Sequence, residues 1–392
     1  MKKKKIIFII VLFSMFSTCT FSYALYEFTC IFTLYNTSAT NLAFGLDSGT
    51  ANIWHKNPLD IWSNPAKLGY YKGFAFGYSH DKWFDDLNLD IYHNSSYLTF
   101  GWKGLGILLP SLNNSSKFGT TMDYGEQEVY DAHGNLLRKF NSYETCSQFA
   151  FGINCLEFIN YFSKENQLFN NLRKYSELSL GLSIDYIRSN LLPYISDSLK
   201  INKGTGLSNN IGALIKITPL NIYDSGIRLD ITAGINIVNI FKSDMTYKYN
   251  NGDKEKQPLP YGNRTGIAGK LSFINIKNLA DEYPLLFDIS KYLLSIYASY
   301  DNSKYGDNPS IWGKGIELTL LDIFSWRFGE CTDKYGQEIG DCEGWGINLN
   351  YKNIVSFQYN YVEFPLGESQ TKQKKEDISF GIDIIKLINE FK

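Results

Sequence analysis

The chain contains 392 residues, with a net charge of −2, 20% charged residues and 16% aromatic residues. The near-neutral charge gives no reason to expect a nucleic-acid partner. The high aromatic content, with 32 glycines beside only 10 prolines, suits curved β-sheet and the interfacial aromatic girdles of membrane barrels.

An export signal is predicted over residues 1–24. Lys2–Lys5 precede the apolar run Ile6–Phe16, and the small residues within 17–24 suit a cleavage site, so we expect a mature chain that begins near Leu25. No later apolar run is long enough for a membrane helix, which leaves the periplasm, the outer membrane or the medium as destinations.

Residues 25–70 show no strand period, so we expect a separate N-terminal element there. Two Asn-Pro steps, Asn57-Pro58 and Asn64-Pro65, lie seven residues apart within it. Proline fixes φ, and each asparagine side chain can bond the backbone that follows it. The two steps therefore predict two tight turns.

Strict alternation of apolar and polar residues recurs from residue 73 onward. The stretch 227–237 shows it best, with Ile, Leu and Ala on one face and mostly polar residues on the other. A tilted strand needs about 9–11 residues to cross the hydrocarbon layer of a bilayer, whereas strands of soluble proteins have about 5–6. Fourteen such segments are predicted: 73–79, 97–103, 105–109, 148–153, 178–187, 211–217, 227–237, 266–274, 292–300, 314–320, 324–329, 345–351, 355–362 and 378–385.

The connections between these segments alternate in length. Outer-membrane barrels have long external loops and short periplasmic turns. The connections expected outside are long and polar: 80–96, 110–147, 188–210, 238–265, 301–313, 330–344 and 363–377. The alternate connections include Gly104, 218–226, 321–323 and 352–354.

Two connections on the expected periplasmic side are long. Residues 154–177 and 275–291 suit helices at the barrel mouth, although each could instead contain a strand that the pattern misses. The predicted fold is all-β: a transmembrane antiparallel up-and-down barrel of about 14 strands, with an N-terminal plug or hatch over 25–70 and the barrel over 71–392.

The sequence contains no recognisable enzyme chemistry. Its four histidines form no metal-binding pair, and there is no nucleophile elbow or phosphate-binding glycine loop, so we expect no catalytic residues, no metal and no cofactor. His80 with Asp81 reads as solvated loop charge rather than as a site. Cys331 and Cys342 flank a Gly- and Asp-rich stretch and could form a disulfide, or remain two thiols.

The opening of the chain resembles that of a known family. A small-residue stretch, a Trp and then Asn64-Pro65-Ala66 lead into the segment 73–79, and Gly344-Trp345-Gly346 lies near the other end. This order is similar to the FadL-related outer-membrane proteins, particularly the branch with PorV and PorQ. The resemblance implies that Asn64, Pro65 and Ala66 form the turn of a luminal hatch, whereas the residues alone equally allow a simple turn before the first strand.

The resemblance also implies two functions. The first is hatch-gated passage of hydrophobic small molecules across the outer membrane, and the alternative is a platform for type IX secretion cargo or partner subunits. Outer-membrane lipid, hydrophobic molecules or secreted protein cargo would be the partners. The hatch and ligand-binding candidates are Trp54, Asn57, Pro58, Trp62, Asn64, Pro65 and Ala66. Packing between the hatch and the wall is the favoured role for the two tryptophans, and ligand contact is the alternative.

Overall fold

The computed structural model describes residues 28–45, 48–83, 90–130, 133–163, 175–191, 201–222, 226–275, 292–333, 340–366 and 369–390. The predicted signal peptide and the connection 276–291 lie outside the described residues.

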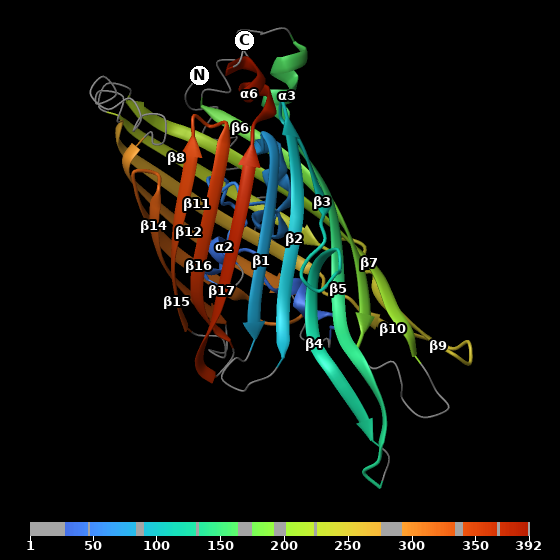
Figure 1. Ribbon diagram of the computed structural model, residues 1–392. Coiled ribbons are helices and arrows are strands. Elements are labelled where there is room, and N and C mark those ends of the chain that lie inside the picture. The colour runs from blue at the N-terminus through green and yellow to red at the C-terminus, as the bar shows by residue number, and fades with distance from the viewer. Residues whose placement is uncertain are drawn as a thin grey trace.

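Antiparallel strands form a single wall that closes on itself, because β1 pairs with β2 on one side and with the last strand, β17, on the other (Figure 1). The strands are β1 Gly73–Trp83, β2 Ile91–Trp102, β3 Leu105–Pro110, β4 Gly119–Tyr130, β5 Leu136–Asn154, β6 Ser176–Asn190, β7 Ile201–Ile222, β8 Ile227–Val238, β9 Asp244–Tyr249, β10 Lys254–Pro258, β11 Gly262–Asn275, β12 Tyr292–Tyr305, β13 Ile311–Leu320, β14 Phe324–Asp333, β15 Gly340–Tyr351, β16 Val355–Leu366 and β17 Ser369–Ile382.

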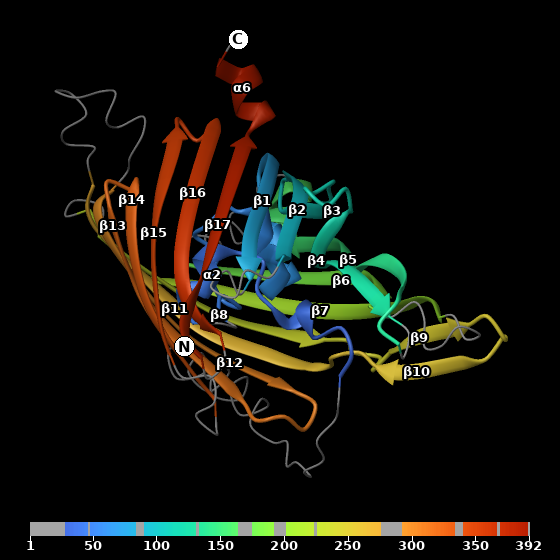
Figure 2. The same ribbon diagram turned by 60° about the horizontal axis from the view of Figure 1, so that its bottom comes forward.

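Three strands do not add positions to the wall. β3 and β4 share one position between β2 and β5, since both pair with both neighbours. β9 and β10 form a hairpin that projects beyond the barrel while β8 pairs directly with β11 (Figure 2). The described strands therefore fill fourteen positions, and the predicted fourteen-stranded antiparallel barrel is confirmed.

Burial alternates along the strands as the sequence pattern predicts. In β6, Leu180 and Leu182 are exposed on the outer face, at 44% and 48%, while Ser179 and Ser183 are buried inside. The same alternation gives the outer face of the wall a belt of Phe, Leu, Ile and Trp side chains. Because apolar groups in water are unfavourable, such a belt suits contact with hydrocarbon.

Several predicted loops are wrong, because the strands continue into them. The expected loop 110–147 contains β4 and the first half of β5, the loop 238–265 contains β9 and β10, and 363–377 contains the end of β16 and the first part of β17. These extensions carry polar residues on both faces, as at Lys372 and Lys375, so the alternation that marks a strand disappears there.

The two described helices outside the N-terminal segment lie at one end of the barrel. The helix predicted within 154–177 is present as α3, Cys155–Phe162, and the last strand ends at Ile382 before α6, Ile384–Glu390. Both lie at the end with the tight turns 321–323 and 352–354, which we call the short-turn end; the β4–β5 and β9–β10 hairpins mark the opposite, loop end (Figure 1). Among the described residues, no helix has the length and apolar character needed to cross a membrane.

The N-terminal segment, residues 28–45 and 48–72, lies inside the barrel and is enclosed by its strands (Figure 2). It contains the 3-10 helices η1 Ile31–Leu34, η2 Pro58–Ser63 and η3 Pro65–Tyr70, and the short α-helix α2 Ala39–Leu42. Almost all of its residues between 36 and 71 are buried. The division into a plug domain and a barrel domain at residue 70 stays a prediction.

Candidate functional site inside the barrel

The two Asn-Pro steps form the turns that the sequence predicts. Asn57 Oδ1 accepts a hydrogen bond from Leu59 N at 3.1 Å and begins η2, and Asn64 Oδ1 accepts one from Ala66 N at 3.0 Å and begins η3. Each proline occupies the first helical position, where its missing N–H leaves no bond unmade. The chain therefore reverses twice within a few residues in the barrel interior.

Asn64 also joins this segment to the wall. Its Nδ2 donates to Thr50 O at 3.1 Å in the segment, and to Ala213 O and Ile235 O, both at 3.3 Å, on β7 and β8. Asn64 is fully buried. Because the Asn64 amide is buried and its own polar groups need partners, these hydrogen bonds favour the position of the turn against two strands.

A row of glycines in the wall receives the segment. Gly101, Gly106, Gly152, Gly181 and Gly212 are paired in register across β2, β3, β5, β6 and β7. A Cβ at Gly181 would lie 2.3 Å from Pro65 C, and one at Gly212 would lie 2.0 Å from Asn64 Oδ1. The backbone of the segment thus rests directly on the backbone of the wall. Sequence reasoning missed this row, since one glycine per strand reveals nothing until the register is known.

Wall carboxylates hold the other half of the segment. Asp301 on β12 accepts from Gly49 N at 3.2 Å and Thr50 N at 2.9 Å, and Asp377 on β17 accepts from Ala39 N at 2.7 Å. These bonds give buried backbone N–H groups of the segment the acceptors that they would otherwise lack. The N-terminal segment is therefore bonded to opposite sides of the barrel.

Two ionisable groups are buried within the segment itself. Lys67 Nζ donates to Ser63 Oγ at 2.7 Å and to the Asp60 carbonyl at 3.0 Å. Burial lowers the pKa of Lys67 to about 8, although the nearby Asp60 opposes this shift, and burial likewise raises the pKa of Asp60. The segment interior therefore disfavours both charged forms.

Trp62 belongs to the main apolar cluster, which lies between the segment and one side of the wall. Trp62 is 5% exposed, and its ring lies 6.4 Å from that of Tyr97. The cluster extends toward the loop end through Trp83, Ile187 and Leu259. Its buried members are Cys30, Phe32, Leu59, Ile61, Trp62, Leu68, Tyr71, Trp83, Tyr97, Leu108, Met122, Cys146, Ala150, Ile187, Met245 and Leu259.

The wall beside this cluster carries an insertion at residues 111–118. The chain loops out there between β3 and β4, and a single bridge joins Leu112 to Phe118. β2 remains paired across this point, since Tyr97 pairs with Pro110 and Ser96 pairs with Gly119. Leu112 and Phe118 are 55% and 58% exposed, whereas Leu108 on β3 and Met122 on β4 are buried members of the apolar cluster.

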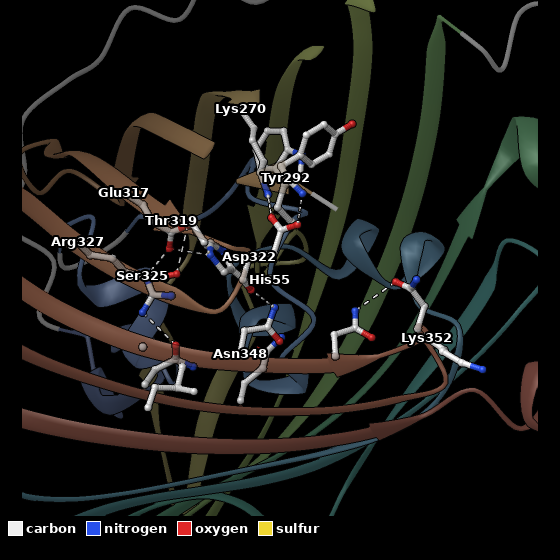
Figure 3. A pocket seen from close by; sticks show the side chains of 17 residues that line it. His55, Lys270, Tyr292, Glu317, Thr319, Asp322, Ser325, Arg327, Asn348 and Lys352 are labelled. Carbon is white, nitrogen blue, oxygen red and sulfur yellow. Dashed lines mark hydrogen bonds and ion pairs between the residues drawn. The ribbon is translucent and has the colours of Figure 1, made fainter. Parts of the chain in front are cut away.

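Trp54 lies away from Trp62, on a cavity of about 460 Å³ that opens at the short-turn end (Figure 3). The Trp54 ring packs edge-on to Tyr297, with centroids 5.1 Å apart. Beside it, His55 Nε2 lies 2.9 Å from Glu317 Oε2, and Arg327 Nε donates to the same oxygen at 2.6 Å. Inward-facing charges thus pair inside the barrel.

The predicted disulfide cysteines lie on neighbouring strands. Cys331 on β14 pairs in register with Gly340, and Cys342 on β15 pairs with Gly329, so the two thiols are diagonal neighbours. Both are buried, and no disulfide joins them in the structure. Their oxidation in the exported protein stays a prediction, which mass spectrometry with and without reductant checks.

The structure therefore brings most of the predicted site residues together. Asn57, Pro58, Trp62, Asn64, Pro65 and Ala66 form one buried stretch of the N-terminal segment. Trp54 faces a different space, and the two cysteines lie apart from both. The glycine row, the carboxylates Asp301 and Asp377, and His55 with Glu317 are the contacts that the sequence pattern did not single out.

Comparison with solved structures finds barrels of similar length. A mutant of the TodX monoaromatic hydrocarbon channel, lacking S2 and S3, has a TM-score of 0.44 at 11% identity, covering 89% of this chain and 99% of its own. The Pseudomonas putida toluene transporter TodX has a TM-score of 0.41 at 9% identity, covering 93% and 100%. A Pseudomonas aeruginosa FadL homologue has a TM-score of 0.41 at 9% identity, covering 88% and 98%. No protein-family model and no curated protein sequence matches the chain.

Proposed function

We propose that this protein is a non-enzymatic outer-membrane barrel of the FadL-related type, near the PorV and PorQ branch, that passes hydrophobic small molecules. The observation that carries the proposal is the apolar cluster between the N-terminal segment and the wall, beside the looped-out residues 111–118. The exposed apolar belt supports a membrane location. The likeness to hydrocarbon channels is compatible with this function, although the proposal does not depend on it.

In this mechanism the N-terminal segment is the hatch. The buried members of the apolar cluster are at most 7% exposed, so a ligand can enter only when groups move apart. Phe32, Trp62 and Leu68 come from the segment, whereas Tyr97 and Leu108 come from the wall. Displacing the segment would therefore open a space with apolar walls on both sides, which is the environment that a hydrocarbon prefers.

Two variants with opposite expected effects test the hatch. Replacing Asn64 and Pro65 with Ala removes the wall bonds of the turn, so uptake of labelled toluene by cells that carry the barrel should rise. A Cβ built at Gly344 lies 3.1 Å from Ala43 Cβ, close to the spacing of a disulfide. The double variant Ala43→Cys with Gly344→Cys should therefore lose uptake when oxidised and regain it with reductant.

The two single cysteine variants are the matched controls, and uptake is compared at equal amounts of assembled barrel. Unchanged uptake both in the variant with Ala at positions 64 and 65 and in the oxidised double-cysteine variant would contradict hatch gating. Absence of any uptake above that of cells without the barrel would contradict passage itself.

A second candidate function has its own observation. The β4–β5 hairpin projects from the loop end (Figure 1), and Tyr130, Leu136 and Leu137 on it are 46–52% exposed. Exposed apolar side chains on a projecting hairpin suit a protein-interaction platform. Replacing Leu136 and Leu137 with Ser should leave toluene uptake unchanged, but it should abolish cross-linking to secreted cargo if the platform function holds.

A further inference from the structure

A cavity of about 460 Å³ lies at the short-turn end, and the proposed passage of hydrophobic molecules does not use it. Side chains from β11 to β16 line it together with Trp54 and His55 of the N-terminal segment, and His55 lies beside Glu317 and Asp322 in Figure 3. Its volume of about 460 Å³ falls within the range of roughly 300–1,000 Å³ of small-molecule sites. The residues of the turns at Asp322 and Lys352 line its mouth.

The charges of this cavity are already compensated. Arg327 and His55 both contact Glu317, Lys270 Nζ lies 4.0 Å from Asp322 Oδ1, and Lys352 Nζ lies 2.7 Å from Glu390 Oε1. Figure 3 shows the Glu317–Arg327 group on one side and Lys270 beside Asp322 on another. A charged ligand would find no unpaired opposite charge here, and burying it would carry a desolvation cost. A neutral ligand avoids this cost.

Two of the amide side chains that line the cavity have a carbonyl oxygen without a hydrogen-bond donor. Five amides line the cavity: Asn348, Asn350, Asn353, Gln358 and Asn360. Asn348 Nδ2 donates to Asp322 O at 3.3 Å and Asn350 Nδ2 donates to Asn353 Oδ1 at 3.2 Å. The Oδ1 atoms of Asn348 and Asn350, however, are buried and accept no hydrogen bond from the described residues. A ligand with hydroxyl donors would satisfy both acceptors when the two side chains turn toward the cavity.

Aromatic surface lies beside these polar groups. Trp54 on the segment and Tyr292 at the start of β12 both line the cavity, with the hydroxyls of Thr319 and Ser325 nearby. Aromatic rings offer a flat apolar face, and the amides and hydroxyls offer donors and acceptors around it. A sugar ring has this same combination of C–H faces and a polar rim.

We propose that this cavity is a binding site for a neutral short saccharide, presented from the side of the membrane that the short-turn end faces. The ligand's hydroxyls donate to Asn348 and Asn350, and its C–H face packs against Trp54. The site is separated from the apolar cluster by the N-terminal segment, so the proposal goes beyond hydrocarbon passage and does not rest on it.

Isothermal titration calorimetry of the full-length barrel in detergent tests the site, with cellobiose, chitobiose and maltotriose as neutral probes. Glucosamine and digalacturonate are the cationic and anionic comparators. Saturable binding of a neutral saccharide, at least about tenfold tighter than either comparator, is the expected result. Absence of saturable binding by all three neutral probes would overturn the proposal, as would a preference for a charged comparator.

Variants locate the binding. Replacing both Asn348 and Asn350 with Leu keeps the side-chain size but removes both acceptors, so affinity should fall about tenfold or more. Asn263→Leu, at an exposed asparagine near the loop end, is the matched control and should bind as the native protein does. The rim variant Asn353→Ala provides a second test if the double variant does not fold. Equal affinity in the native, rim and double variants would place the ligand elsewhere.

Discussion

Asn64 carries an unusually large share of the contacts between the N-terminal segment and the wall. Its side chain caps η3 through Ala66 N and donates to carbonyls on the segment, β7 and β8. Hydrophobic residues around it could be exchanged for others of similar size, whereas no other side chain of this length offers both the acceptor and the two donors in one plane. The residue is therefore specified by geometry rather than by burial.

Asn64→Ala should lower the free energy of unfolding by about 1–3 kcal/mol, because it removes the side-chain cap of η3 and the buried hydrogen bond to Thr50 O. Limited proteolysis should also cleave the N-terminal segment faster. Asn251→Ala is the control, since Asn251 likewise accepts a backbone N–H, from Asp253 at 3.0 Å, but is exposed. Equal effects of the two substitutions on thermal unfolding in detergent would contradict the assigned role.

Lys67 gives the stability a specific pH dependence. Its pKa is about 8 in the folded protein and about 10.4 in an unfolded chain. Between these values the unfolded state binds the additional proton, so the free energy of unfolding rises with pH over that window. Thermal melts from pH 7 to 10 should show the native protein gaining stability relative to Lys67→Met, which lacks the titrating group. Parallel curves would show that Lys67 does not titrate in this way.

The strands of one half of the wall bind the N-terminal segment closely, because glycines on these strands leave room for its backbone. Gly101, Gly106, Gly152, Gly181 and Gly212 leave a stripe without side chains across five strands. Pro65 and Asn64 approach this stripe within the space that a Cβ would fill. A barrel with ordinary inward-facing side chains at these positions could not hold the segment where it lies.

Gly181→Ala should therefore displace η3 and destabilise the protein by about 1–3 kcal/mol, the usual cost of overpacking. Gly269→Ala on β11 is the matched control, because a Cβ there meets only Asp230 O at an ordinary 3.8 Å. Thermal unfolding and proteolysis of the N-terminal segment report the difference. A Gly181→Ala barrel as stable as the control would mean that the segment does not depend on this stripe.

The sequence predicts the elements more completely than their contacts. The stretch 227–237 is nearly the whole of β8, and both Asn-Pro turns form, because one face of a strand and the fixed φ of proline are local properties. β4 and the loop-end half of β5 were missed because polar residues occur on both of their faces. The glycine stripe and the pairing of His55 with Glu317, 262 residues apart, depend on register and closure, which no local pattern contains.

At the scale of the whole molecule, the barrel is inverted relative to a soluble protein: its apolar side chains face outward and its interior is largely polar. Leu180, Leu182 and Ile184 on the outside oppose Ser179 and Ser183 on the inside. The main apolar cluster lies between the N-terminal segment and β1 to β6, with Met245 and Leu259 added at the loop end, and two smaller clusters join the segment to β15 and β16 and to β11 and β12. Stability therefore depends on the surrounding lipid as well as on internal packing.

Leu182→Arg should destabilise the barrel by about 2–4 kcal/mol in a bilayer, the cost of a cation at mid-membrane on the lipid face of a barrel. Leu136→Arg, at a position equally exposed but on the projecting hairpin, should have little effect. Folding titrations in liposomes measure both. Similar small effects at the two positions would contradict the placement of the belt in hydrocarbon.

The bond from Ala39 N to Asp377 joins residues 338 positions apart and gives the molecule an order of assembly. The part of the chain that is translated and exported first finds its final partners on the strand that is made last. Until β17 has paired with β1, the segment 36–52 lacks the Asp377 carboxylate as an acceptor for Ala39 N. The many Asn, Ser and Thr side chains of this segment can be hydrated until then. The closure of the barrel by β17 and the final placement of the N-terminal segment are thus a single late event. A chain shortened at its C-terminus should therefore lose the closed barrel and the bound segment together.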